Sequence, residues 1–444
     1  MFDLTAGTQM LVLFAALLVL RVPVAFSLGI SAMYAMWQMG FGLDLVGDLI
    51  SSGITKFSLL AIPFFILAGI LMGTAGLADR MVRFFRILIG SLPGGMGVVG
   101  VVVSLFWGAV SGSGPASVAA IGPMIMRGMV DDGYSRAYAA ALVCTGAALS
   151  IVIPPSIGLV IYGVIAEVSI GSLFIAAILP GILMGLMMLA TLPFAQRSRP
   201  HGAAAPAALA EQHAQEVSYG DAPWATQVWL SFRDAFWGLL TPVVILGGIY
   251  VGIFTPTEAA IIAAVYAMAL GFFVYRTLTI ASLTAAIQDA AKASAVVLMV
   301  VTFASLFGWV VTVDDVVGRY SEALMTFSNN PMLILLVIAI VLLIAGMFMD
   351  AITIMFICLP IFLPVVHQMG WDPIWFGIFL SITLAIGLFT PPVGINLFVA
   401  ANITGLTLER IAAAAVPFLL ASLIGIAVVG GWTELTQYLL GWMK

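Results

Sequence analysis

Two Pro-Pro pairs interrupt long apolar segments of this 444-residue chain. The first pair is Pro154-Pro155, and the second, Pro391-Pro392, follows it 237 residues later. Proline has no N–H group and clashes with the preceding helical turn, so each pair breaks a helix and frees backbone carbonyl groups. Matching interruptions in the two halves predict a chain built from two copies of one unit.

The amino-acid composition indicates the environment in which these two breaks lie. Hydrophobic residues make up 63% of the chain and charged residues only 8%, which predicts an all-α polytopic membrane protein. Leu11–Leu20, followed by Arg21, lacks the features of a cleavable signal peptide, so we interpret it as a retained span. Cys144 and Cys358 lie in apolar runs, where packing is favoured over redox or metal chemistry. We expect no cofactor and no nucleic-acid partner, because the sequence carries neither a P-loop nor a basic patch.

The predicted duplication is seen when the second half of the sequence is aligned on the first, chiefly at prolines and glycines. Five positions coincide at an offset of 237, and three more coincide at an offset of 239. The pairs are Pro123/Pro360, Gly133/Gly370, Pro154/Pro391, Pro155/Pro392 and Pro180/Pro417, then Phe64/Phe303, Gly69/Gly308 and Arg80/Arg319. The sequence therefore predicts a first repeat over 1–195, a cytoplasmic linker over 196–234 and a second repeat over 235–444.

Basic residues assign an orientation to each segment, because cytoplasmic loops carry the excess of Lys and Arg. With an outside N-terminus, twelve of the fifteen Lys and Arg residues fall on the cytoplasmic side. The same topology inverts the second repeat relative to the first and places both termini in the periplasm. It predicts ten spans, with the unbroken ones including segments near 5–20, 24–40, 57–76, 171–195, 236–254 and 256–275.

The remaining segments complete each inverted repeat. Broken helices are expected over 136–167 and 373–403, and re-entrant hairpins over 94–127 and 331–366. Each repeat is also expected to contain scaffold helices and an interfacial arm, which in the first repeat is Met81–Gly90. Broken helices at matching places in two inverted repeats are typical of a transporter's binding site.

Each hairpin tip is expected to meet the broken helix of its own repeat. Freed carbonyl groups and hydroxyls are hard oxygen ligands suited to Na⁺, and helix starts favour anions. The first sodium site is predicted from Ser111, Gly112, Ser113, Ser117, Pro154, Pro155 and Ser156. The second is predicted from Gly346, Asp350, Thr353, Thr390, Pro392, Gly394 and Asn396. Contacts to the substrate are predicted from Ser113, Gly114, Ser156 and Asn396, and ordinary kinks with small-residue packing are the alternative explanation.

Two carboxylates stand out in these apolar surroundings. Asp350 at a hairpin tip costs about 2.5–3.5 kcal/mol by insertion scales unless it is paired, so we expect it to be solvated, paired or linked to an ion. Capping the second hairpin arm is compatible with that role. Glu258 follows Thr255 and Pro256, as at a helix start, and is expected to cap rather than to contact substrate.

Four stretches carry a resemblance to a known family. They are Ser111-Gly112-Ser113-Gly114-Pro115-Ala116-Ser117-Val118-Ala119-Ala120-Ile121-Gly122, Ile153-Pro154-Pro155-Ser156, Thr255-Pro256-Thr257-Glu258-Ala259 and Thr390-Pro391-Pro392-Val393-Gly394-Ile395-Asn396. In combination they look like the large membrane subunit of TRAP (tripartite ATP-independent periplasmic) transporters, over nearly the whole chain. The family pattern often has a run of serines where this tip carries Gly114-Pro115.

The resemblance implies an elevator mechanism in a bacterial inner membrane. A transport domain of hairpins and broken helices would slide against a scaffold, carrying Na⁺ and an organic acid such as a C4-dicarboxylate, a 2-oxoacid or a sialic acid. It also implies two partners, a small four-span membrane subunit and a periplasmic substrate-binding protein.

Two other functions compete with this one. A self-sufficient sodium/carboxylate symporter with the same inverted fold would need no binding protein. An intramembrane serine hydrolase around Ser113 would need a positioned base, and His367 lies on the opposite membrane side in this topology. We therefore expect a transporter and not an enzyme.

Overall fold

The computed structural model describes residues 5–92, 94–195, 222–316, 318 and 330–441, which form helices and the turns between them. The first repeat contains α1 (Ala6–Val19), α2 (Val24–Gln38), α3 (Leu43–Ile54), η1 (Phe57–Leu60), α4 (Ala61–Thr74), α5 (Leu77–Ile89), α6 (Gly95–Ser111), α7 (Gly114–Asp131), α8 (Arg136–Ala148), η2 (Leu149–Ile151), α9 (Ile157–Ile165), α10 (Ile170–Leu189) and α11 (Leu192–Ala195). The second contains α13 (Trp224–Leu239), α14 (Thr241–Tyr250), α15 (Pro256–Ala269), η5 (Leu270–Val274), α16 (Ile280–Val313), α18 (Pro331–Phe348), α19 (Ala351–Gln368), α20 (Pro373–Gly387), α21 (Ile395–Thr404), α22 (Leu408–Gly431) and α23 (Glu434–Gly441).

Local sequence explains where several of these helices begin. At the start of α15, the Thr255 N–H donates to Glu258 Oε2 over 2.8 Å, and the Glu258 N–H donates to Thr255 Oγ1 over 3.3 Å. This reciprocal capping box satisfies two N–H groups that a helix start leaves unpaired, and Pro256 occupies a position where a missing N–H costs nothing. The predicted capping role of Glu258 is confirmed.

The length and hydropathy of a helix decide whether it can cross a membrane. Among the described residues, seven helices are long and apolar enough, or eight if the pair α13 and α14, bent by 41°, is one span. The predicted ten spans therefore include shorter helices, such as α1 with 14 residues and α2 with 15. The arms of the second hairpin, α18 and α19, have 18 residues each and pass the same length test. The re-entrant depth of both hairpins stays a prediction.

The boundary between the repeats differs from the predicted one. α13 begins at Trp224, so the last part of the segment expected to be linker, 196–234, is helical. Its Asp234 lies 3.2 Å from Arg80 Nε and 3.4 Å from Arg83 Nη1, both on the arm helix α5. The helix forms because its aromatic and aliphatic side chains pack on α5, which the polar composition of this stretch did not indicate. Residues 196–221, 317 and 319–329 lie outside the described residues.

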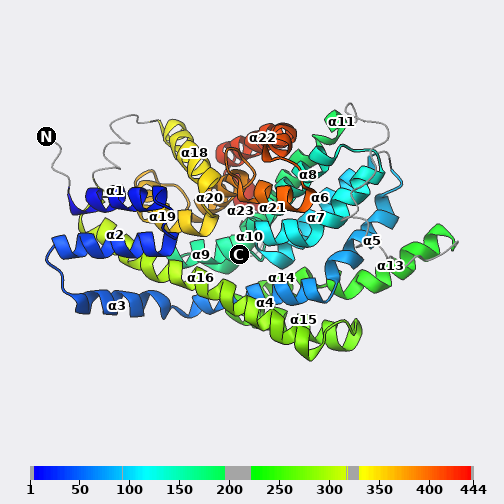
Figure 1. The fold of residues 1–444 in the computed structure, drawn as a ribbon, viewed down its shortest axis with the longest axis horizontal. Helices are drawn as coiled ribbons and strands as arrows, with labels where there is room; N and C mark the ends of the chain where they lie inside the picture. Colours follow the sequence, from blue (N-terminus) through cyan, green and yellow to red (C-terminus); the bar gives the residue numbers. More distant parts are fainter. Residues whose placement is uncertain (1–4, 93, 196–221, 317, 319–329, 442–444) are drawn as a thin grey trace.

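Two groups of helices divide the molecule, as Figure 1 shows. The first group, here called the frame, is α1, α2, α3, α4, α15 and α16, which pack on one another along the left and the bottom of the view. The second, here called the body, is α6, α7, α8, α9, α10, α18, α19, α20, α21 and α22. Contacts of α4 with α6 and of α16 with α19 join the two groups.

The two broken helices lie side by side in the body and run in opposite directions. Arg136, at the start of α8, donates from Nη2 to the carbonyl oxygen of Thr404, at the end of α21, over 3.1 Å. At the other end, the Tyr162 hydroxyl in α9 donates to the carbonyl oxygen of Pro373, the first residue of α20, over 2.5 Å. This antiparallel pairing agrees with the inverted orientation that the Lys and Arg distribution predicted.

Candidate functional site

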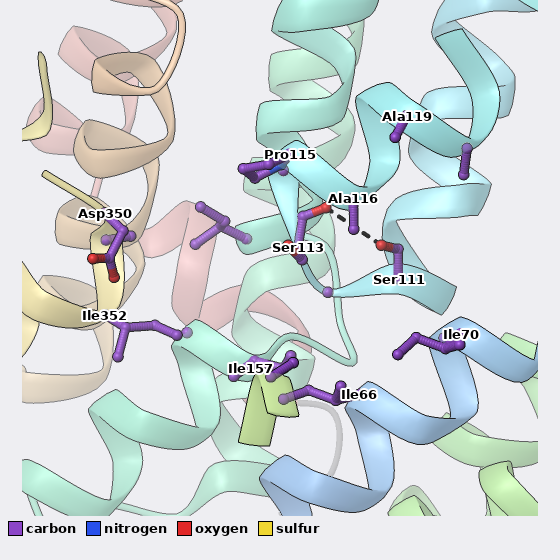
Figure 2. A pocket seen from close by; sticks show the side chains of 18 of the residues that line it. Ile66, Ile70, Ser111, Ser113, Pro115, Ala116, Ala119, Ile157, Asp350 and Ile352 are labelled. Atoms are coloured by element: carbon purple, nitrogen blue, oxygen red, sulfur yellow. Dashed lines mark hydrogen bonds between the residues drawn. The ribbon is translucent and has the colours of Figure 1, made fainter. Parts of the chain in front are cut away.

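A cavity of about 630 Å³ lies where both hairpin tips meet both broken helices (Figure 2). Ser113 and Asp350 line it from the two tips, and Ile157 and Ile395 line it from the starts of α9 and α21. The frame closes the remaining side, through residues of α4 and α16. The cavity is therefore bounded by both repeats and by both the frame and the body.

The first hairpin tip turns at Gly112. Its φ of +61° lies in the left-handed region that favours glycine, and it ends α6 so that α7 can begin at Gly114. The hydroxyls of Ser111 and Ser117 both donate to the carbonyl oxygen of Ser113, over 3.3 and 2.8 Å. Ser113 precedes α7 in an extended conformation, and no side chain caps this helix. The tip thus presents hydroxyl oxygens beside an uncapped helix start.

The first break lies against this tip. A side chain at Gly112 would contact Ile157, the first residue of α9. The Ser156 hydroxyl donates to the carbonyl oxygen of Ile151 and accepts the Leu159 N–H, so it caps α9. The sequence predicts that Ser156 contacts the substrate. In the structure Ser156 is fully buried and does not line the cavity, so it supports the cavity wall by capping α9.

The second tip meets the second break in the same way. The Gly394 N–H donates to the carbonyl oxygen of Met347 over 3.0 Å, and Gly346 crosses Gly387 with backbone against backbone. Asp350 caps α19, since its carboxylate accepts the Thr353 N–H over 3.0 Å and the Thr353 hydroxyl over 2.6 Å. Both predicted tip-to-break contacts are present, and both Pro-Pro peptide bonds are cis.

Asn396 lies beside the first tip, next to Gly114, with which it was predicted to contact the substrate. Its Nδ2 donates to the carbonyl oxygen of Cys144 in α8 over 2.9 Å, and the Cys144 thiol donates to the Asn396 carbonyl oxygen over 3.3 Å. A Cβ atom at Gly114 would lie 3.0 Å from Asn396 Oδ1. This buried oxygen has no hydrogen-bond partner among the described residues. The side chain assigned to the second sodium site therefore lies beside the first tip, since the antiparallel broken helices exchange contacts across the repeats.

Four helix starts converge on the cavity, namely those of α7, α9, α19 and α21. Each start carries unpaired N–H groups and the positive end of a helix dipole, which stabilise an anion. Ser156 caps α9 and Asp350 caps α19, whereas no side chain caps α7 or α21. At α21, however, the Asn396 N–H donates to the carbonyl oxygen of Leu388 and the Leu397 N–H to that of Gly394, so the start of α7 is the one that suits an anion.

The cavity brings together only some of the predicted residues. Ser111, Gly112, Ser113, Gly114 and Asp350 line it. The predicted residues that do not line it are Ser117, Pro154, Pro155, Ser156, Gly346, Thr353, Thr390, Pro392, Gly394 and Asn396.

The frame side of the cavity was missed by reasoning from the sequence. Gly69 and Gly73 of α4 face the first tip, and a Cβ atom at Gly69 would lie 3.3 Å from the Val110 carbonyl oxygen. Their spacing is that of a GxxxG pair, a sequence signal for close helix packing in membranes. Trp107, a fully buried residue of α6 that also lines the cavity, had no comparable signal.

A family model now decides between the functions that the fold allows. The model described as "Tripartite ATP-independent periplasmic transporter, DctM component" matches residues 11–435. The chain belongs to this family. It is the large membrane component of a TRAP transporter, and thus a permease and not an enzyme.

Individual relatives agree with this assignment. The C4-dicarboxylate TRAP transporter large permease protein DctM of Rhodobacter capsulatus is 36% identical and covers 94% of each chain. The sialic acid TRAP transporter large permease protein SiaM of Vibrio cholerae is 32% identical, covering 95% of this chain and 96% of its own. An isethionate TRAP transporter permease protein, DctMQ of Oleidesulfovibrio alaskensis, is 38% identical over 94% of this chain. This TRAP permease spans 63% of that longer relative.

Solved structures share the fold at low sequence identity. The YdaH transporter of Alcanivorax borkumensis superposes with a TM-score of 0.65 at 14% identity, over 96% of this chain and 98% of that one. MtrF of Neisseria gonorrhoeae gives a TM-score of 0.60 at 15% identity, over 88% of this chain and 84% of that one. These similarities support an all-α, multi-pass transporter fold.

Proposed function

We propose that this TRAP permease carries an organic acid together with Na⁺ into the cytoplasm by an elevator movement of the body against the frame. The observation that carries the proposal is the convergence of four half-helix starts on one cavity between the two repeats. Helix starts favour an anion, and the inverted, broken helices supply carbonyl groups for cations beside it. Relatives named for a C4-dicarboxylate, a sialic acid and 2,3-diketo-L-gulonate all handle acids, which supports the same substrate class.

Sodium binds, in this proposal, at each tip-to-break contact. Ser111, Ser113 and the Pro154-Pro155 break supply oxygens to the first site, and Asn396 Oδ1 lies beside it. Asp350 and the Pro391-Pro392 break supply oxygens to the second. The inward Na⁺ gradient and the membrane potential drive uptake, since each charge gains about 2.3 kcal/mol per 100 mV. Coupling requires that Na⁺ and substrate each raise the affinity for the other.

In this proposal, two further proteins complete the tripartite transporter. A small four-span membrane subunit completes the scaffold, and a periplasmic binding protein delivers the acid to the outer side of a bacterial inner membrane. Both termini of this chain lie in the periplasm in the topology that the Lys and Arg residues support.

Reconstitution with both partners tests the proposal. The acid is the one that stabilises the binding protein in a thermal-shift screen, and its uptake into liposomes is measured in an Na⁺ gradient. We expect uptake to disappear when K⁺ replaces Na⁺. Uptake that persists in K⁺ contradicts sodium coupling, and uptake that persists without the binding protein favours the self-sufficient symporter.

Three substitutions test the sodium sites in the same liposomes. Ser113→Ala and Asn396→Ala each remove a polar group and Asp350→Asn removes a negative charge, so we expect the Na⁺ concentration for half-maximal uptake to rise by about tenfold. Thr312→Ala is the control, because this exposed hydroxyl of α16 bonds only within its own helix among the described contacts. An unchanged Na⁺ dependence in all three variants contradicts the site assignment.

A further inference from the structure

The two sides of the cavity differ in chemistry. On one side lie the hydroxyls of Ser111 and Ser113 and the uncapped start of α7 (Figure 2). On the other side lie Asp350, whose carboxylate is already bonded to Thr353, and the apolar side chain of Ile352 (Figure 2). One side therefore suits an anion, whereas the other side carries a negative charge.

The surface between these two sides is almost wholly aliphatic and aromatic. Ile66 and Ile70 of α4, Val297 of α16 and Trp107 of α6 contribute to it. Among the described residues that line the cavity there is no Lys, Arg or His. A volume of about 630 Å³ falls within the range of ligand pockets, about 300–1,000 Å³, so a substantial apolar group fits here.

A second carboxylate on the substrate finds no cationic side chain in this cavity, and the Nε1–H of Trp107, which has no partner among the described residues, is a single neutral donor. Against the aliphatic wall, a charge loses its hydration without gaining a hydrogen bond. Against Asp350, two like charges repel across a medium of low dielectric constant. A sodium ion at Asp350 neutralises that carboxylate but leaves no surplus positive charge for a second one.

We propose that this permease selects a monocarboxylate with an apolar body, which sets it apart from permeases for dicarboxylates or sugar acids. The single carboxylate binds at Ser113 and the start of α7, and the hydrocarbon body lies against α4, α16 and Ile352. The inference rests on the proposed function, since it names the substrate class of the same site.

Binding to the full chain in lipid nanodiscs tests this selectivity without a binding protein. The probe is radiolabelled 4-methylpentanoate, measured in Na⁺ and in K⁺. The competitors are adipate, a dianion of the same carbon number, and 4-methylpentan-1-ol, which keeps the body and lacks the charge. We expect binding in Na⁺ only, with both competitors weaker than unlabelled acid by about tenfold or more.

A pair of adjacent valines supplies matched variants for the apolar wall. Val297 lines the cavity, whereas Val296 is 65% exposed on the outer face of the same helix. Val297→Thr replaces one methyl group with a hydroxyl of similar size and should weaken 4-methylpentanoate binding several-fold. Val296→Thr should leave this binding unchanged. Equal effects of the two variants overturn the placement of the apolar body.

The outcomes separate this inference from the proposed function. Sodium-dependent binding of adipate that is tighter than that of 4-methylpentanoate overturns the inference and leaves sodium-coupled carboxylate transport standing. Sodium-dependent binding of neither acid overturns both.

Discussion

Gly346 and Gly387 hold the second hairpin against the second broken helix. A Cβ atom at Gly387 would lie 2.6 Å from the Cα atom of Gly346, a distance that backbone atoms cannot accommodate without moving apart. The crossing brings Met347 close enough to accept the Gly394 N–H. Because neither glycine has a side chain, the two backbones approach closely, and this close approach sets the position of the tip that carries Asp350.

Gly387→Ala is expected to destabilise the protein by about 1–3 kcal/mol, because the added methyl group overpacks a backbone crossing. Gly247→Ala is the control, since no atom lies within 4 Å of its Cβ position, and it should stabilise the helix by about 0.5–1 kcal/mol. Thermal unfolding of both variants in nanodiscs measures the difference. Equal unfolding temperatures speak against a close crossing of α18 and α20.

The contacts of Asn396 could not be predicted from the sequence. The tip serines and the prolines of both breaks were predictable, because proline and glycine dictate backbone geometry locally. The contacts of Asn396 with Cys144 and Gly114 join residues far apart in the chain, and only the packing of α21 against α7 and α8 creates them. Burial of Cys144, expected from its apolar surroundings, is confirmed.

Helix ends decide which parts of each element face the cavity. Ser156 and Asp350 cap α9 and α19, so these helices begin firmly at the cavity wall. Ser156 was expected to bind Na⁺ and substrate, whereas sequence signals predicted the capping roles of Asp350 and Glu258. These signals failed at α13, where contacts with α5 extend a helix into a stretch that composition alone assigns to a linker.

Ser156→Ala should cost about 1 kcal/mol of stability through the lost cap and should also reduce uptake, since α9 begins at the cavity. Ser169→Ala removes the equivalent cap of α10, where the hydroxyl accepts the Ser172 N–H over 3.2 Å away from the cavity. We expect a similar loss of stability with uptake unchanged. Unfolding temperature and initial uptake rate, measured on the same preparations, test whether the α9 start has a functional role beyond stability.

The sequence predicts two inverted copies of one unit, and the two broken helices of the structure run antiparallel and contact each other. That prediction rests on proline register and Lys/Arg placement, which are features of the sequence alone. The family resemblance implied a scaffold and a transport domain, but the residues at which the two groups pack were not predictable, since helix packing in membranes depends on shape at small residues such as Gly69. An elevator requires these two groups to move relative to one another, and a contact between them reports that movement.

Lys56 and Glu167 form such a contact between frame and body. Lys56 lies between α3 and η1, and its Nζ is 3.7 Å from Glu167 Oε1, just after α9. Gln9 and Gln38 form a comparable contact within the frame, with Gln38 Nε2 donating to Gln9 Oε1 over 2.7 Å. The two pairs differ in whether an elevator movement must separate them.

Uptake by cross-linked double-cysteine variants tests the elevator movement most directly. Lys56→Cys with Glu167→Cys and Gln9→Cys with Gln38→Cys are each joined by a short, cleavable bismaleimide in a Cys358→Ala background. We predict that cross-linking the first pair abolishes Na⁺-driven uptake and that cleaving the linker restores it, while the second pair transports normally in both states. Undiminished uptake with the first pair fully cross-linked would contradict movement of the body against the frame.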